Sequence, residues 1–222
     1  MLILAFDTAT PAVTVALHDG RQAIAQESVI DARRHGELLA PMIGRILASA
    51  GAGPGDLTRI AVGTGPGPYT GLRAGLATAQ ALGHALGIVV DGVCTLDVIA
   101  AQARAGAAGR QFLVATDARR REVYWARYSP QAERIGDPQV GSPAQVPAGY
   151  PVAGDGPSLH PALAAEGAKI EPRYPAAATL AEIVSRRAAV GGAAESARPL
   201  YLRRPDAREP GRPKRVSQGQ GP

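Results

Sequence analysis

The pattern of apolar and polar positions predicts a chain in which short strands alternate with helices. Apolar runs at residues 2–6, 13–17 and 23–29 predict three strands from the N-terminus, and a polar turn at 7–11 separates the first two. Further strands are predicted at 60–62, 88–93, 112–116, 122–128 and 200–202, with residues 117–121 forming a hairpin turn between the third and fourth of these.

Helices are predicted where apolar residues recur every three or four positions. Residues 33–50 carry such a stripe, and Pro41 inside it predicts a helix that begins near that residue or bends there. A second stripe ends at Leu86 and follows a glycine and proline hinge at 63–68, with Thr70 placed to cap its first turn. Other helices are predicted at 95–103, where Thr95 is the expected cap, and at 159–167 and 179–191, whereas 138–151 is predicted to be a loop.

One face of the helix after the hinge consists of residues with little or no side chain. Gly71, Gly75, Ala79 and Gly83 recur at four-residue spacing. Each glycine inside a helix costs about 1 kcal/mol relative to alanine, so this face needs a packing reason. The close approach of another backbone is the simplest one. That backbone could be a helix of the same chain or a helix of a second chain, and the spacing favours neither.

The hinge itself invites comparison with loops that bind phosphate before a helix N-terminus. No Gly-Lys-Ser/Thr closes it, the G-x-G-x-x-G spacing is missing, and Pro66 and Pro68 remove amides that a phosphate would use. The pattern therefore favours a structural turn. Asp7 and Thr8 in the first turn leave a similar choice between a phosphate site and a turn that hydrogen-bonds its own backbone.

The sequence gives little support for a metal site or for a catalytic nucleophile. His35 lies on the first predicted helix, but Leu39 stands four residues later, where a second histidine ligand would be needed. Cys94 is the single cysteine, which excludes an internal disulfide and predicts a small core residue. We expect no metal, no cofactor and no catalytic residue.

Composition and charge point to a cytoplasmic protein with a near-neutral body. The sequence has no apolar run long enough to span a membrane, and residues 2–6 enter a strand without the features of a signal peptide. The net charge is +5, but residues 203–222 hold six basic and two acidic side chains. The rest of the chain carries only +1, so a broad RNA-binding face is not indicated, and the basic tail is expected to be solvated and disordered.

Several segments together resemble one known family. The stretch GTGPGPYTGLRAGLATAQALG resembles the GPGSFTGLR-type signature of the TsaB family of tRNA threonylcarbamoyladenosine biosynthesis proteins, although Pro68 and Tyr69 replace the usual Ser and Phe. The segments ILAFDTAT, RRHGELLAPMI, DARRREVYWARY and PLYLRRPDA agree in the same order and extend the resemblance over residues 2–207.

This resemblance implies an α/β fold of the actin-like, sugar-kinase and Hsp70 ATPase class, with two mixed-sheet lobes and flanking helices. It implies lobes at 1–104 and 105–204 and a basic tail at 205–222. Members of the family act as non-catalytic scaffolds. They pair with the catalytic subunit TsaD, an ATPase named TsaE joins them, and tRNA is reached only indirectly. An isolated chain of this kind could instead form a homodimer.

The partner surface implied by the resemblance combines the apolar stripe of the first predicted helix with the small-residue face of the second. Its expected residues are Leu38, Leu39, Met42, Ile43, Ile46, Leu72, Gly75, Leu76, Ala79 and Gly83. Two alternatives remain open: an ATP-dependent small-molecule kinase, which would use Asp7 to bind ATP, and a glycoprotease-like hydrolase, which would need metal.

Overall fold

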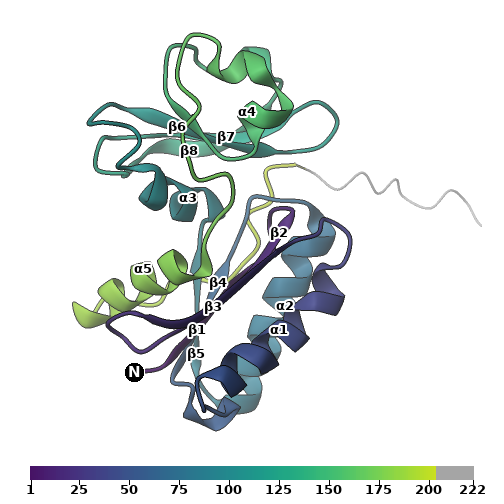
Figure 1. Cartoon of the computed structure of the whole chain (residues 1–222), viewed down its shortest axis with the longest axis vertical. Coiled ribbons are helices and arrows are strands. Elements are labelled where there is room, and N and C mark those ends of the chain that lie inside the picture. The colour runs from purple at the N-terminus through teal and green to yellow at the C-terminus, as the bar shows by residue number, and fades with distance from the viewer. Residues whose placement is uncertain (204–222) are drawn as a thin grey trace, which may run out of the picture.

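The computed structural model describes residues 1–203 of the 222 and shows two α/β lobes stacked along the long axis of the molecule (Figure 1). The predicted tail at 205–222 lies outside the described residues. In the described part, no helix combines the length and apolar character needed to cross a lipid bilayer.

The first lobe contains a mixed sheet of five strands. They are β1 (Ile3–Asp7), β2 (Ala12–His18), β3 (Ala23–Ile30), β4 (Arg59–Gly63) and β5 (Val89–Val93), in the order β3-β2-β1-β4-β5. The first three strands are antiparallel, whereas β1, β4 and β5 are parallel. Phe6 therefore lies opposite Val15 on one side and Val62 on the other.

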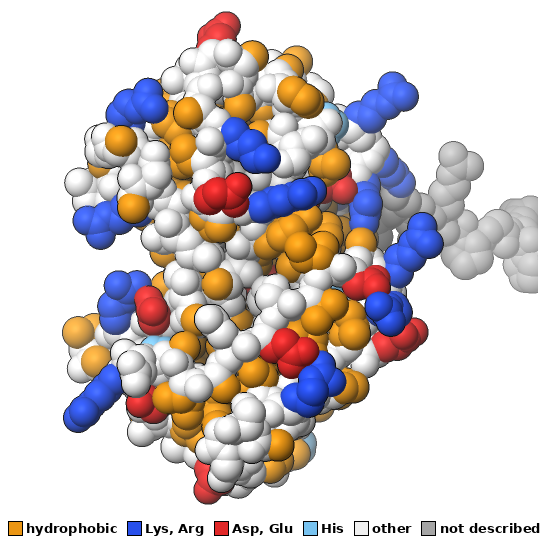
Figure 2. All heavy atoms as spheres, in the orientation of Figure 1, with side chains coloured by type: hydrophobic (Ala, Val, Ile, Leu, Met, Phe, Trp, Pro, Cys, Tyr) orange, Lys and Arg blue, Asp and Glu red, His pale blue; other side chains and the backbone are white. Residues whose placement is uncertain are grey.

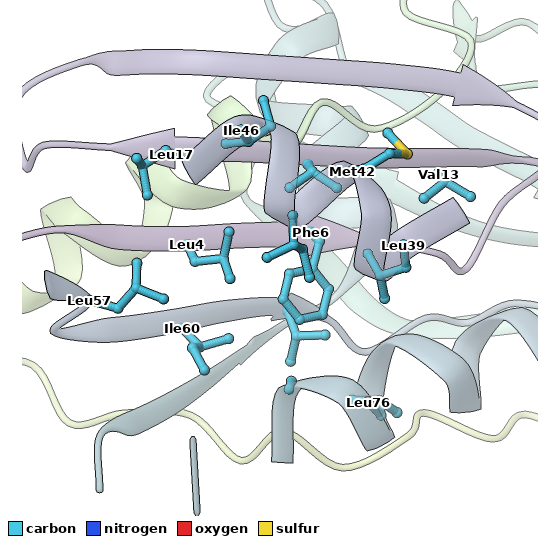
Figure 3. Packing of buried hydrophobic residues seen from close by; sticks show 14 of the residues in the cluster. Leu4, Phe6, Val13, Leu17, Leu39, Met42, Ile46, Leu57, Ile60 and Leu76 are labelled. Carbon is cyan, nitrogen blue, oxygen red and sulfur yellow. The ribbon is translucent and has the colours of Figure 1, made fainter. Parts of the chain in front are cut away.

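Helices cover both faces of this sheet. Helices α1 (His35–Ser49) and α2 (Tyr69–Leu86) lie side by side on one face, and α5 (Ala177–Ala189) lies on the other (Figure 1). Alternate residues of each strand point to opposite faces, so Leu4, Phe6 and Leu17 pack against α1 and α2, as Figure 3 shows. Ile3, Ala5 and Ala16 pack against α5 instead.

The second lobe repeats this plan with a smaller sheet. Its strands are β6 (Phe112–Asp117), β7 (Val123–Tyr128), β8 (Arg134–Gly141) and β9 (Val152–Ala153), in the order β8-β7-β6-β9. Helix α3 (Thr95–Ala103) packs on one face. The other face is covered by short turns, namely η2 (Pro143–Gln145), α4 (Gly156–Leu159) and η3 (Pro161–Ala164). One more turn, η1 (Pro54–Asp56), precedes β4.

The two sheets share one topology. In each, a central strand pairs antiparallel with the next strand in sequence and parallel with a strand that arrives after a crossover. This duplication confirms the predicted architecture of two mixed-sheet α/β lobes.

Two predicted boundaries are wrong because of proline. Residues 138–141 were expected in a loop, but they complete β8, where Pro138 is tolerated because β8 is an edge strand of its sheet. The helix predicted at 159–167 is instead two short turns, since Pro161 follows His160, which ends α4. Pro41, in contrast, lies inside α1 on its exposed side.

Two other local predictions are also corrected. Thr70 does not cap α2, which begins one residue earlier and has Pro68 at the N-cap position without a side-chain hydrogen bond. Residues 200–202 do not form a strand, although the Leu200 amide donates to the Thr64 carbonyl at 2.8 Å.

Candidate functional site

A buried polar cluster lies where β1 ends, beneath the N-termini of α2 and α3. Asp7 is completely buried, and both of its carboxylate oxygens accept hydrogen bonds. The Ala9 amide donates to Oδ1 at 2.7 Å, and the Thr95 hydroxyl donates to Oδ2 at 2.7 Å. Thr95 in turn accepts from the Gly65 amide at 3.2 Å. Thr95 therefore starts α3 as expected but joins the hinge to Asp7 instead of capping its own helix.

Burial raises the pKa of the Asp7 carboxyl above its usual value, and the hydrogen bonds from Ala9 and Thr95 oppose that rise. A carboxylate that reacts or binds a ligand needs an oxygen directed at that ligand. Here both oxygens hold the hinge and the first turn together. The geometry therefore assigns Asp7 a structural part in joining β1 to α3.

The glycines of the hinge allow it to lie directly against the first turn. A Cβ added at Gly63 would lie 2.0 Å from Asp7 Oδ2, and one added at Gly67 would lie 2.0 Å from the Ala9 carbonyl oxygen. Real Cβ atoms do not approach other atoms this closely. The hinge is a structural turn packed on the β1–β2 turn, which agrees with the preference drawn from its prolines.

The small-residue face of α2 packs against the chain's own sheet. A Cβ at Gly71 would lie 2.5 Å from the Thr8 carbonyl oxygen, and one at Gly75 would lie 2.3 Å from the Thr8 hydroxyl oxygen. That hydroxyl donates to the Gly71 carbonyl at 2.7 Å. Gly83 meets Val90 of β5 in the same way, at 2.3 Å. The approaching backbone is thus neither helix considered above but the β1–β2 turn and β5.

This packing corrects the expected partner surface. Leu38 is half-buried, and the other nine residues are buried inside the chain itself. Figure 3 shows four of them in the core: Leu39, Met42, Ile46 and Leu76. The apolar stripe of α1 meets the sheet because burying large side chains there removes the most apolar surface from water. Pairing with a second chain stays a prediction, but these side chains are not available for it: Leu38, Leu39, Met42, Ile43, Ile46, Leu72, Gly75, Leu76, Ala79 and Gly83.

The opposite side of the same two helices also carries a repeat of small residues. We call it the outer small-residue face; nothing in the described chain lies within 4 Å of a Cβ added at Gly36 or Gly44. Its residues are exposed except for Ala74, which is half-buried: Gly36, Ala40, Gly44 and Ala48 on α1, and Ala74, Ala77, Ala81 and Ala85 on α2.

A cavity of about 210 Å³ opens between the N-termini of α1 and α2, the β1–β2 turn and the second lobe. Arg33 and Arg119 line it from the two lobes, together with Thr70 and His35. The His35 ring nitrogen Nε2 lies 2.7 Å from the Thr10 carbonyl oxygen. His35 therefore fastens α1 to the first turn, and its hydrogen-bonding capacity at Nε2 is already used.

The remaining candidates for chemistry are also held in structural positions. Burial raises the pKa of the Cys94 thiol to about 12, which makes it a poor nucleophile. Burial also raises the pKa of Asp155 to about 6, and its Oδ1 accepts from the Asp117 amide at 3.0 Å. Gly154 and Gly156 lie against the Ala115 carbonyl oxygen, as in a plain strand-to-helix turn. Among residues 1–203, no histidine, cysteine or acidic cluster is arranged to hold a metal ion.

Neither the outer small-residue face nor the cavity was predicted from the sequence. A signal for the first was present, since Gly36, Ala40, Gly44 and Ala48 repeat every four residues just as the inner set does. The cavity had no such signal because Arg33 and Arg119 are far apart in sequence and meet only when the lobes stack.

Comparisons with known proteins agree with this description. Residues 28–200 match the family model of TsaD, tRNA N6-adenosine threonylcarbamoyltransferase. The chain is 47% identical to an uncharacterized Mycobacterium tuberculosis protein, covering 93% of each. It is 33% identical to the Escherichia coli tRNA threonylcarbamoyladenosine biosynthesis protein TsaB, covering 91% of this chain and 95% of that protein.

Solved structures give the same result. The YeaZ protein of Pseudomonas aeruginosa superposes with a TM-score of 0.74 and 31% identity, covering 90% of this chain and 99% of that one. A second structure from the same organism, described as similar to the peptidase YeaZ, has a TM-score of 0.78 and 32% identity, covering 91% and 99% of the two chains.

Proposed function

Because the chain belongs to the TsaB family, we propose that it is a non-catalytic subunit of tRNA threonylcarbamoyladenosine formation in the cytoplasm. In this proposal it pairs with a TsaD-like catalytic subunit, and a TsaE-like ATPase joins the complex. The partner binds the lobe built on the sheet of β1–β5, which lies within residues 1–104. The second lobe is built on the sheet of β6–β9 within residues 105–204, although α5 of that segment packs on the first sheet. The chain acts by holding its partner in the working geometry.

The arrangement at the end of β1 supports a role without catalysis. In a nucleotide-binding member of this fold class, the first turn must leave room for a phosphate. Here the Gly67 backbone lies against the Ala9 carbonyl, and both oxygens of Asp7 are occupied by Ala9 and Thr95. A phosphate between this turn and the hinge would have to displace the chain's own backbone, which is an argument against the kinase alternative.

The outer small-residue face is the observation that carries the pairing. Small side chains on both α1 and α2 allow a helix of another protein to approach closely, as the inner face does with the sheet. Charged side chains at the edge of this face, such as Glu37 and Arg45, can set the orientation of a partner. The pairing surface is therefore moved from the buried stripe to the outer small-residue face.

The test places larger side chains on this face and leaves the core unchanged. The tagged chain is co-expressed with the TsaD-like protein of the same cell, and Gly44→Leu and Ala81→Leu are compared with the unchanged chain. We expect each variant to keep its thermal midpoint and to lose at least tenfold in copurified TsaD-like protein, with a matching fall in modified tRNA. Leucine at these positions holds the backbones apart.

Ala189→Leu is the matched control, because Ala189 is an exposed alanine of α5 on the opposite side of the sheet. It should copurify like the unchanged chain. Unaltered copurification by both test variants would place the partner elsewhere. An isolated chain that runs as a dimer, and becomes monomeric in the same two variants, would show that two copies use this face when the partner is missing.

A further inference from the structure

The turn between β6 and β7 presents three arginines in succession in an uncommon backbone conformation. Arg119, Arg120 and Arg121 have φ values of 60°, 55° and 61°, in the left-handed region that favours glycine. The turn is held by the Asp117 carboxylate, which accepts from the Arg119 amide at 2.7 Å, and by the Ala118 amide, which donates to the Glu122 carbonyl at 3.0 Å. It points at the junction of the two lobes.

Arginines from both lobes converge on the cavity at this junction. Arg119 lines the cavity from the second lobe and Arg33 lines it from the segment before α1. The hydroxyl-bearing residues Thr8, Thr10 and Thr70 complete its polar lining, and within the described chain neither aspartate nor glutamate lines it. A space of about 210 Å³ with cationic and hydroxyl groups fits a phosphate group better than an apolar ligand.

Much of this positive charge is not neutralised locally. Within residues 1–203, no carboxylate lies in ion-pair range of the exposed guanidinium of Arg33 or of Arg121. Arg119 lies 3.4 Å from an Asp117 oxygen, an exposed pair that contributes little to stability and leaves other donors available. Figure 2 shows Lys and Arg side chains along the right-hand edge, where the lobes meet.

We propose that Arg33, Arg119 and Arg121 form a binding site for backbone phosphates of the tRNA. The tRNA as ligand rests on the proposed function, whereas the phosphate chemistry rests on the cavity and its charges. This proposal departs from the expectation that the chain reaches tRNA only indirectly. A body with a net charge near zero still binds RNA where its cations are gathered, because phosphate contacts depend on local charge.

The test measures binding of a labelled, unmodified tRNA transcript to the full chain alone over a range of salt concentrations. Each lost phosphate contact lowers the slope of log K against log salt by about 0.7–0.9. We expect the double variant Arg33→Gln/Arg119→Gln to bind at least tenfold more weakly at low salt and to lower the magnitude of the slope by about 1.4–1.8. Arg121→Gln should lower it by about one.

Arg110→Gln is the matched control, because Arg110 is exposed at the other end of β6 and the substitution removes the same charge. If Arg110→Gln lowers the tRNA affinity as much as the double variant does, the proposal is overturned, because only net charge would then matter. A chain ending at Arg203 provides a second arm. If it retains the difference between the unchanged and double-variant sequences, the site is supported; if it loses all binding, the tail is the RNA-binding element and the proposal fails.

These measurements use the chain without its partner, so they separate the two proposals. Failure of tRNA binding with normal copurification of a TsaD-like protein would overturn the phosphate site alone. Failure of copurification with normal tRNA binding would overturn the pairing alone.

Discussion

Both faces of α2 carry a repeat of small residues, but the two repeats have opposite surroundings. On the inner face, Gly71, Gly75 and Gly83 touch the β1–β2 turn and β5 so closely that a Cβ would not fit. On the outer face, Ala77, Ala81 and Ala85 are exposed. The comparison teaches that a repeat of small residues allows close packing. The repeat does not show whether the packing partner is the same chain or another protein.

The largest effect is expected from adding bulk to the inner face. Gly75→Leu should lower the free energy of unfolding by about 4 kcal/mol, since its Cβ alone would lie 2.3 Å from the Thr8 hydroxyl oxygen. Ala77→Leu, two residues further on the outer face, should change it by less than about 0.5 kcal/mol. Urea unfolding of both variants measures the difference. Equal destabilisation would mean that the two faces are not distinct.

A somewhat smaller effect is expected from removing bulk beneath α1. Met42 is completely buried in the core, so Met42→Ala should cost about 3 kcal/mol through lost burial and the cavity left behind. Leu38 is only half-buried, and Leu38→Ala should cost about 1 kcal/mol. If Met42→Ala leaves the unfolding midpoint unchanged and weakens partner binding instead, the original assignment of this stripe to a partner surface would be restored.

The smallest effect concerns two acids in different surroundings, the buried Asp7 and the more accessible Asp31. Burial raises the pKa of Asp7, so its favourable contribution is complete below the unfolded value of 3.8 and is lost as pH rises through the folded pKa. Hydrogen bonds from the Arg33 amide and the Arg34 side chain lower the pKa of Asp31, which is partly exposed. Its contribution is present above 3.8 and is lost as pH falls through the folded pKa.

Asp7→Asn should therefore flatten the decline in stability with rising pH, and its amide oxygen can still accept from Ala9. Asp31→Asn should instead remove a small stabilisation near pH 7. Urea midpoints at pH 4, 5.5 and 7 compare the two variants. If the stability of both variants changes with pH in the same way, the opposite pKa shifts of Asp7 and Asp31 would be contradicted.

Periodicity and proline chemistry were sufficient for most of the fold. Apolar runs located the strands of the first sheet and β6 and β7 of the second, whereas β8 was not predicted. The stripe at 33–50 located α1 with its buried side correctly composed of Leu39, Met42 and Ile46. The sequence could not say that this side faces the chain's own sheet, because an apolar stripe is equally suited to a partner. Burial inside one chain depends on how the elements pack, which periodicity does not encode.

The candidate site was less accessible to sequence reasoning. Asp7 was identified, but its role depends on Thr95, which is 88 positions away in the chain. Pairs at such separation leave no local pattern. The same holds for Arg33 and Arg119, which share a cavity only because the lobes stack at one particular place.

The contact between the hinge and the first turn has a consequence for reading this family's sequence variation. Gly63, Gly67 and Gly75 have no space for a side chain, so homologues should keep glycine at these positions whatever the chain binds. Invariance at these three positions would record how closely the end of β4, the hinge and α2 pack on residues 7–9. Conservation at Gly44 and Ala81 would instead point to a partner, because these residues are exposed and no packing inside the chain restricts them.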